Sequence, residues 1–215
     1  FLQMRIHRHS DKSYSLDQQR YALNTLRRYD PRGVYPKRAT PLPPDYIYSK
    51  DNKPKTPKDK SDLERRFPDI HFRSAVCTLL YLAYNTRADI LFAVCKLAKA
   101  CIDPGQADHE ALRWLIGYIR NKPDLAIKFY PNKSGTPIHQ ILQTARVPIS
   151  DLVVFTDASW QDCPDTGRST VGHLIFYNGA LIDANSSMPS PVAMSSAESE
   201  YLSACNGAMA VAHIR

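Results

Sequence analysis

The sequence lacks several features that would assign it to a class at once. Its 215 residues contain no apolar stretch near the ~20 residues that a membrane-spanning helix needs. The first ten residues show no basic start followed by an apolar run, as a signal peptide does. The 8 glycines are scattered and form no phosphate-binding loop, and the 7 histidines follow no nucleophile motif. We therefore expect no membrane partner and no Ser/His/Asp hydrolase.

Cysteine is also sparse. The 5 cysteines are odd in number, have no CxxC spacing and lie mostly in apolar helical patterns. This usage argues against a disulfide framework and against a zinc site. We expect buried free thiols in an intracellular protein. The cysteines are Cys77, Cys95, Cys101, Cys163 and Cys205.

Positive charge is present but unevenly distributed. Residues 1–70 hold 16 Lys and Arg against 9 Asp and Glu, which accounts for the whole formal net charge of +7. Residues 71–215 are balanced, with 12 of each kind. A basic segment beside a neutral domain is typical of a protein that binds phosphate backbones, although solvated linkers are also often rich in lysine. The charge alone leaves nucleic-acid binding open.

The N-terminal third contains two kinds of pattern. Residues 1–8 and 13–16 are typical of two strands around a turn, and a helix with apolar residues at helical spacing follows from Asp17, a plausible N-cap. Residues 31–68 then contain half of the 16 prolines. We expect residues 31–70 to be an extended, charged connector without a core of its own.

The middle of the chain has helical periodicity. Three apolar stripes predict three helices, and the segment LAIKFY then predicts a strand. Residues 131–151 are typical of a connector with a short apolar piece. The stripes are Phe72, Val76, Leu79, Leu80 and Ala83; Ile90, Val94, Leu97, Ala98 and Cys101; and Ala111, Trp114, Leu115 and Tyr118.

From Leu152 the periodicity changes to that of strands. The segments LVVFTD, VGHLIFY and ALIDA predict a three-stranded meander, and PVAMS could extend or follow the third strand. A helix follows, with Ser195 or Ser196 as its N-cap. We expect its inner face to consist of Ala197, Tyr201, Ala204, Cys205 and Ala208.

The segment VVFTDASWQD ends an apolar strand on a carboxylate, Asp157. An unpaired carboxylate in apolar surroundings is costly, so such a residue usually caps, pairs or binds a metal. The first strand of a meander and the first turns of the following helix can share a surface, where Asp157 and Glu198 or Glu200 would suit Mg²⁺. The alternatives are a turn or capping role for Asp157 and a helix-dipole or capping role for the glutamates.

Several blocks, in this order, resemble the C-terminal half of copia-type retrotransposon polyproteins, from the end of the reverse transcriptase into RNase H. The first segments, FLQMRI and LDQQRYALNTLRRY, are similar to the strand pair and helix that follow the polymerase active site. The later blocks are FRSAVCTLLYLAYNTRADILFAV, HEALRWLIGYIRNKPDLAIKFY, FTDASWQDCPDTGRSTVGHLIF and VAMSSAESEYLSA.

The resemblance implies an α/β fold in five segments. We expect an N-terminal strand pair and helix, a helical thumb-like or connection-like region, and a partial RNase H-like fold made of a three-stranded meander and a helix. The segments are residues 1–30, the primer-contacting end of the reverse transcriptase palm; 31–70, a Pro-rich basic linker; 71–130, the helical region; 131–151, a connector; and 152–215, a truncated RNase H-like domain.

The resemblance also assigns site residues. Asp157 matches the first RNase H aspartate, and Glu200, which precedes Tyr201, matches the catalytic glutamate better than Glu198. Both matched acids would be catalytic and would hold Mg²⁺. Arg168, in the block GRST, is a candidate phosphate contact or simply a surface arginine in a turn.

Other positions depart from the family pattern. Gln3 and Cys77 stand where the family usually has Gly, and Ala88 stands where it has Pro. The paired polymerase aspartates and the later RNase H aspartates are not in the sequence, and both ends look cut. A two-magnesium site would therefore be incomplete.

The resemblance implies a parent enzyme that copies RNA into DNA and degrades the RNA strand of RNA–DNA hybrids. Its partners would be the hybrid, DNA and RNA, and its locations would be the nucleus or cytoplasmic virus-like particles. We expect this chain to be inactive alone. A non-catalytic nucleic-acid-binding remnant and a degenerate relic are the alternatives.

Overall fold

A computed structural model describes residues 3–68, 70–132, 135–148 and 150–214. The chain forms two compact units. The first consists mainly of Gln18–Leu125, and the second mainly of Arg5–Asp17, Ala126–Asp162 and Thr166–Arg215. Within the described ranges, no helix has both the length and the apolar character that a membrane crossing requires.

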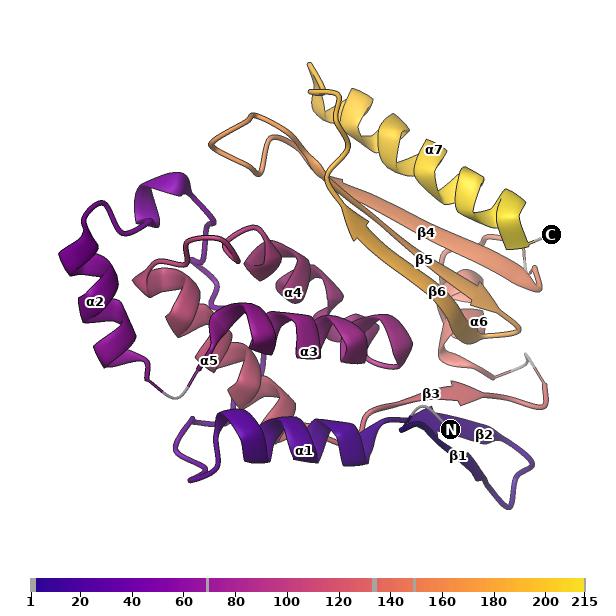
Figure 1. Ribbon diagram of the computed structural model, residues 1–215. Helices are drawn as coiled ribbons and strands as arrows, with labels where there is room; N and C mark the ends of the chain where they lie inside the picture. Colours follow the sequence, from indigo (N-terminus) through magenta and orange to yellow (C-terminus); the bar gives the residue numbers. More distant parts are fainter. Residues whose placement is uncertain (1–2, 69, 133–134, 149, 215) are drawn as a thin grey trace. The chain divides into compact units, whose positions relative to one another are not determined.

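The first unit is helical (Figure 1). Most members of the three predicted stripes lie in helices α3, α4 and α5 and are buried, so this part of the core is confirmed. Ile90 lies in η2 instead, and Cys101 lies beyond the end of α4. Trp114 is an exception and is partly exposed. The elements of the unit are α1 (Gln19–Tyr29), η1 (Lys50–Asn52), α2 (Pro57–Arg66), α3 (Phe72–Asn85), η2 (Ala88–Ile90), α4 (Leu91–Ala98) and α5 (Gln106–Asn121).

The predicted helix cap at Asp17 is wrong. Asp17 ends a strand instead, and its carboxylate pairs with Arg5 at 3.0 Å. Helix α1 begins after Gln18, whose side chain makes no capping bond and accepts a hydrogen bond from Thr86 at 3.0 Å. Because the ion pair engages the carboxylate of Asp17, the helix starts without a side-chain cap.

The Pro-rich stretch is not extended throughout. Helix α2 lies within it, and Phe67 and Ile70, just beyond, are buried. Thr56 and Asp59 form a reciprocal capping box, and Pro57 occupies the first turn, where a proline costs no hydrogen bond. Pro57 therefore begins a helix inside a stretch whose proline content predicts an extended chain.

The second unit contains two antiparallel sheets. The first joins the predicted N-terminal strand pair, β1 (Arg5–Arg8) and β2 (Tyr14–Asp17), to β3 (Ala126–Phe129), the strand predicted from LAIKFY. The apolar piece of the predicted connector forms α6 (Pro137–Thr144).

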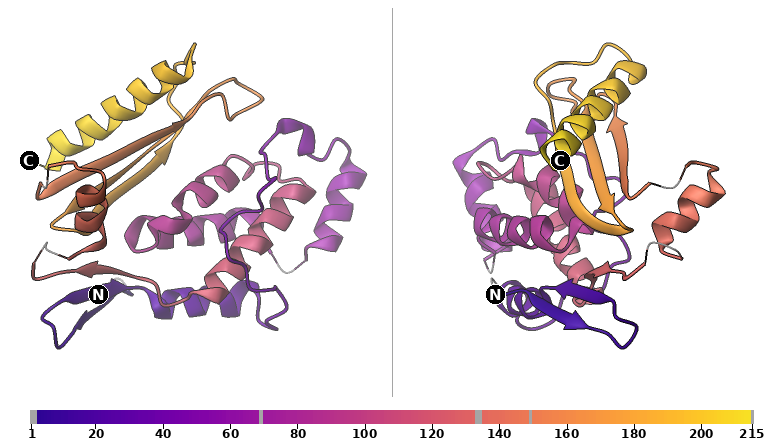
Figure 2. Two further views of the ribbon diagram at one scale, coloured as in Figure 1. Left: turned by 180° about the vertical axis from the view of Figure 1, so that it is seen from behind. Right: turned by 90° about the vertical axis from the view of Figure 1, so that its right-hand side faces the viewer.

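The second sheet has the order β4 (Leu152–Ser159), β5 (Thr170–Tyr177) and β6 (Ala180–Ser187), as the predicted meander requires. The segment PVAMS does not extend it. Helix α7 (Ser196–Ile214) lies along one face of the sheet and contacts β4 and β5 (Figure 2). The molecule is therefore of the mixed α/β class. The more specific RNase H-like assignment and the five-segment division stay predictions.

The predicted inner face of α7 is wrong. The buried residues are Ser199, Ser203 and Gly207, whereas Tyr201 is 78% exposed and Cys205 is exposed. A Cβ added at Gly207 would lie 2.6 Å from Cγ2 of Thr156, so the helix backbone sits too close to β4 for a larger residue. The contact is made by small residues, which an apolar pattern does not reveal.

The cysteines differ in part from the expectation. All five are free thiols, as predicted. However, Cys77 and Cys205 are exposed, Cys95 and Cys101 are partly buried, and Cys163 alone among the five is fully buried.

Candidate functional site

Asp157 lies in β4 with an exposed side chain. Val154 and Thr156 both approach Gly207 of α7, and side chains alternate between the faces of a strand. The carboxylate of Asp157 is therefore directed to the face of the sheet opposite the one that α7 covers. Its backbone carbonyl is the group that meets α7, at 2.7 Å from Oγ of Ser203.

Glu198 participates in the cap of α7. Its backbone N–H donates to Oγ of Ser195 at 3.2 Å, and its carboxylate accepts from the N–H of Met194 at 2.7 Å. Ser195 is therefore the N-cap, one of the two residues predicted. This geometry supports the capping alternative for Glu198.

Glu200 is exposed and lies one turn before Ala204 and two turns before Ala208 on the same row of α7. These two alanines line an apolar groove of about 500 Å³ with Val154 and Thr156. Glu200 thus belongs to the side of the helix that borders β4, with no capping role in the described structure.

The carboxylate of Asp157 is directed away from the face of the sheet that α7 covers. Glu200 lies on the flank of α7 next to β4, and Glu198 is engaged in the cap. In the part of the chain that the structure describes, no three His, Cys, Asp or Glu side chains gather as a metal site would need. The assignment of Asp157 and Glu200 as metal ligands remains a prediction, and we derive no catalytic step from it.

Arg168 follows Gly167, which has a φ of 63°. The side chain of Arg168 is partly buried, and its backbone N–H donates to Oγ1 of Thr166 at 3.4 Å. This is turn geometry of the kind that the surface-arginine alternative requires. A phosphate contact by Arg168 stays a prediction.

One departure from the family pattern has a visible consequence. Gln3, where the family usually has Gly, adopts a φ of 59°. This left-handed conformation favours glycine because it lacks a Cβ. Gln3 therefore adopts a backbone conformation that suits the glycine that the resemblance gives at this position.

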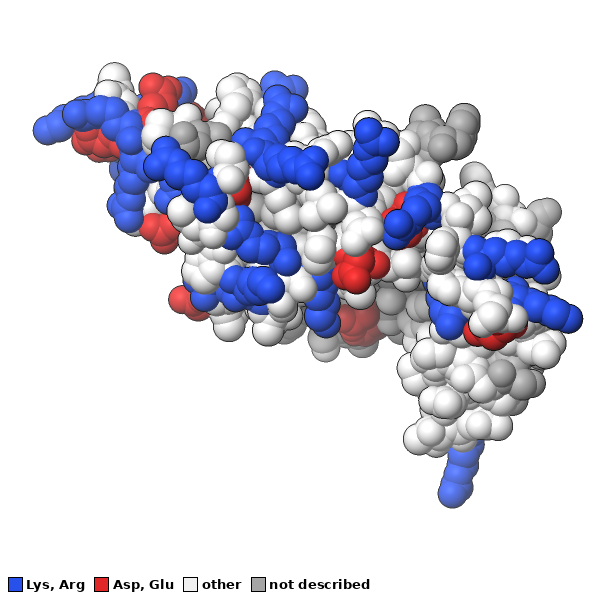
Figure 3. Space-filling model, turned by 90° about the horizontal axis from the view of Figure 1, so that it is seen from below, with Lys and Arg blue, Asp and Glu red and all other residues white. Residues whose placement is uncertain are grey.

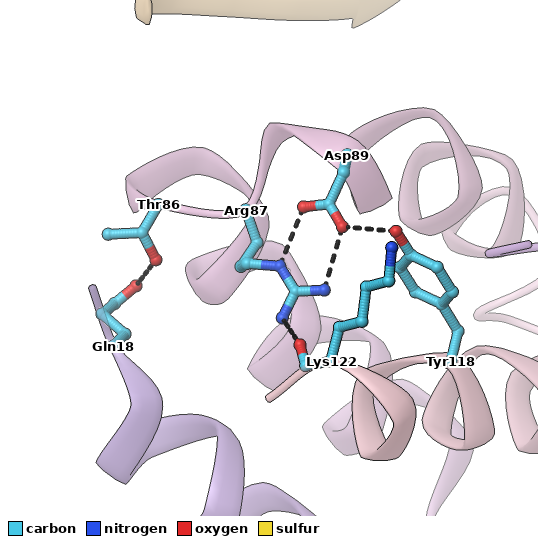
Figure 4. Close-up of polar contacts among 6 residues, drawn as sticks. All are labelled: Gln18, Thr86, Arg87, Asp89, Tyr118 and Lys122. Carbon is cyan, nitrogen blue, oxygen red and sulfur yellow. Dashed lines mark hydrogen bonds and ion pairs between the residues drawn. The ribbon is translucent and has the colours of Figure 1, made fainter. Parts of the chain in front are cut away.

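A polar network around the buried residue Arg87 in the first unit was not predicted (Figure 4). Arg87, whose side chain is 2% exposed, binds both carboxylate oxygens of Asp89, at 2.8 and 2.9 Å. It also donates to the carbonyl of Lys122 at 2.8 Å, while the hydroxyl of Tyr118 donates to Asp89 at 2.8 Å. Burial and the bond to Asp89 raise the pKa of Tyr118. The network ties η2 to α5, which is a structural role.

The sequence contained a signal for this network in the segment TRAD. An arginine two residues before an aspartate, just after an apolar helix, can form a local bidentate pair. The apolar pattern around Arg87 did not indicate that Arg87 itself would be buried.

Comparison with known proteins gives consistent results. The chain is 28% identical over 189 residues to the retrovirus-related Pol polyprotein from transposon TNT 1-94 of Nicotiana tabacum, covering 88% of this chain and 13% of that protein. It is 29% identical over 192 residues to the corresponding polyprotein from transposon RE2 of Arabidopsis thaliana, covering 89% of this chain and 11% of that protein.

The chain is homologous to a segment of plant retrotransposon polyproteins. A shorter relative is the secreted RxLR effector protein 161 of Plasmopara viticola, 29% identical over 134 residues, which are 62% of this chain and 84% of that protein. No protein-family model matches the chain. No solved structure matches it either.

Proposed function

We propose that this chain is the part of a retrotransposon polyprotein that runs from the end of the reverse transcriptase into RNase H. We further propose that its own contribution is to bind RNA–DNA hybrids without cutting them. The observation that carries the proposal is the similarity to two transposon polyproteins over 88% and 89% of the chain.

The distribution of charge supports nucleic-acid binding. Helix α1 contains no acidic residue, and Arg20, Arg27 and Arg28 on it are exposed. Figure 3 shows many exposed Lys and Arg side chains, with several Asp and Glu side chains among them. Cations arranged in this way can neutralise phosphates along a backbone and release counterions.

The proposal favours binding over cleavage for the isolated chain. A second candidate function is magnesium-dependent cleavage of the hybrid by Asp157 and Glu200, which the resemblance implies for the parent enzyme. Against this function in the isolated chain stand the orientation of Asp157 away from α7 and the lack of a third ligand among the described residues. Binding alone needs neither.

The experiment that tests the proposal measures the affinity of the purified chain for a labelled RNA–DNA hybrid across a salt series. We expect log affinity to fall linearly with log salt. Replacing Arg20, Arg27 and Arg28 by Gln should flatten that slope by up to about 0.9 for each phosphate that is no longer neutralised. Replacing three exposed residues elsewhere, Gln140, Gln143 and Thr144, by Ala is the control.

Two results would contradict the proposal. A chain that binds no hybrid at low salt has no such function, and the absence of a cooperative unfolding transition would favour the degenerate relic. Cleavage of the hybrid in magnesium that disappears in Asp157→Asn would instead establish the second candidate.

A further inference from the structure

A cavity of about 380 Å³ lies within the helical unit, between α2, the start of α3 and α5. This volume is in the range of sites that bind small molecules. The floor of the cavity is apolar and aromatic, because Phe67, Ile70 and Phe72 line it and are each at most 5% exposed. The cavity can therefore take up a flat apolar group.

His109 is the polar residue of this floor. It is 8% exposed, and its ring stacks on Phe67 at 4.5 Å and stands edge-on to Phe72 at 5.1 Å between centroids. Its Nδ1 is buried and has no hydrogen-bond partner in the described part of the chain. Burial and the charge of Arg113 lower the pKa of His109 to about 4, so the ring is neutral at neutral pH and can accept one hydrogen bond. Since buried polar groups usually have a partner, a bound molecule that donates to this ring would supply one.

One wall of the cavity is the N-terminus of α3. The first turn of α3 contains no acidic residue, so no side chain of that turn neutralises the positive end of the helix dipole. Arg73 in this turn is exposed, lines the cavity and makes no ion pair with another described residue. Burial raises the pKa of the Cys101 thiol in the same wall, and the charge of Arg73 opposes that rise. An anionic group is therefore favoured at this end of the cavity.

The acidic residues of the wall limit the charge of that anionic group. Asp103 accepts a hydrogen bond from Lys60 at 3.4 Å, so these two charges offset each other. Glu64 also lines the cavity and has no such partner among the described residues. A second negative charge on a ligand would be repelled by Glu64. A carboxylate, which carries one charge and matches the planar fork of an arginine, fits better than a phosphate dianion.

We infer that this cavity binds a planar aromatic monocarboxylate whose ring carries a hydroxyl group. The ring would lie against Phe67 and Phe72, the carboxylate would accept hydrogen bonds from Arg73, and the hydroxyl would donate to His109. The inference goes beyond the proposed function and does not depend on it, because no described residue of α1 lines the cavity.

Isothermal titration calorimetry of the whole chain tests the inference, with 6-hydroxynaphthalene-2-carboxylate as the probe. We expect a Kd below about 1 mM, as is usual for a ligand of this size. The carboxamide of the probe has no charge to pair with Arg73 and should bind about tenfold more weakly. Naphthalene-2-carboxylate lacks the hydroxyl and should bind about threefold more weakly than the probe.

Three variants locate the binding site. Arg73→Gln should weaken binding of the probe about tenfold and change the affinity for the carboxamide by less than about twofold, whereas damage to the cavity would weaken both. Arg32→Gln, which changes an exposed arginine outside the cavity wall, is the matched control and should have no effect. His109→Phe keeps a ring but cannot accept a hydrogen bond, so this variant should bind the probe and naphthalene-2-carboxylate equally.

The contrary outcomes are specific. The inference is overturned if the parent chain does not bind the probe, if it binds the carboxamide equally well, or if Arg73→Gln leaves the affinity for the probe unchanged. If His109→Phe does not fold, equal affinity of the parent chain for the probe and for naphthalene-2-carboxylate would overturn it. A chain that binds the probe but no hybrid would support the inference and contradict the proposed function, and the reverse result would contradict the inference alone.

Discussion

The helical unit and the contact between α7 and the sheet of β4, β5 and β6 are packed with different kinds of residue. The helical core is filled by large aliphatic side chains that are at most 1% exposed: Leu79, Leu82, Leu97, Leu112, Leu115, Ile116 and Ile119. Helix α7 instead meets its sheet through Ser199, Ser203 and Gly207. Large side chains gain stability from buried apolar area, whereas small residues gain it from close approach of the backbone.

The first way to sharpen this comparison is to remove a large core residue. Leu115 is fully buried in α5, so Leu115→Ala should lower the free energy of unfolding by about 3 kcal/mol through lost apolar burial and a residual cavity. Urea unfolding measures the change. The control is Leu23→Ala in α1, where the side chain is 37% exposed and the loss should be under about 1 kcal/mol. Equal losses would mean that the helical core is not built as described.

The second test adds one carbon to the small-residue contact. Gly207→Ala should lower the free energy of unfolding by about 2 kcal/mol, because its Cβ would lie 2.6 Å from Cγ2 of Thr156. In an exposed helix the same change would stabilise by about 1 kcal/mol. Thermal or urea unfolding of the variant decides between the two signs.

A double variant shows whether the clash is the cause. Thr156→Ser deletes Cγ2, so Gly207→Ala should cost much less in that background than in the parent chain. If Gly207→Ala stabilises the parent chain, α7 does not approach β4 as closely as the structure shows.

The third test uses the one histidine of the helical core that stacks on an aromatic ring. His109 lies 4.5 Å from Phe67 between ring centroids, and burial, followed by the charge of Arg113, lowers its pKa to about 4. Because His109 is protonated more readily in the unfolded chain than in the folded one, protonation favours unfolding. The contribution of His109 to the free energy of unfolding should therefore be constant above about pH 6.5 and fall as the pH drops towards 4. We expect a loss of up to about 2 kcal/mol over that window.

The control for this dependence is His109→Phe, which keeps a stacked ring but cannot take up a proton. Subtracting its stability from that of the parent chain at each pH isolates the contribution of His109. A difference that does not change between pH 7 and pH 4 would show that His109 is not held in its neutral form.

The same contrast explains what the sequence could and could not predict. The stripes of α3, α4 and α5 were found because large apolar residues recur at helical spacing. In α7 nearly every position is small or apolar, so periodicity selected Ala197 and Tyr201, while the buried row was Ser199, Ser203 and Gly207. Close approach of two backbones is a tertiary property, and a residue pattern does not record it.

The candidate site was predictable only in part, for a related reason. The positions of Asp157 on the first strand and of two glutamates in the first turns of α7 followed from the pattern, and the structure confirms those elements. Side chains of β4 alternate between the two faces of the sheet, so Asp157 and Thr156 point to opposite faces. The sequence does not reveal which face α7 covers, whereas the packing of Thr156 against Gly207 does.

The smallest expected effect concerns the two glutamates of α7. Ser195→Ala removes the acceptor for the N–H of Glu198 and should cost about 1 kcal/mol in unfolding free energy, as loss of an N-cap usually does. Glu198→Gln, which weakens the reciprocal bond to Met194, should cost about half as much, and Glu200→Gln, outside the cap, less than either. Guanidinium unfolding of the three variants gives this order. An equal or larger loss for Glu200→Gln would show that Glu200, not Glu198, supports the start of the helix. The structure would then no longer favour Glu200 over Glu198 as the candidate functional glutamate.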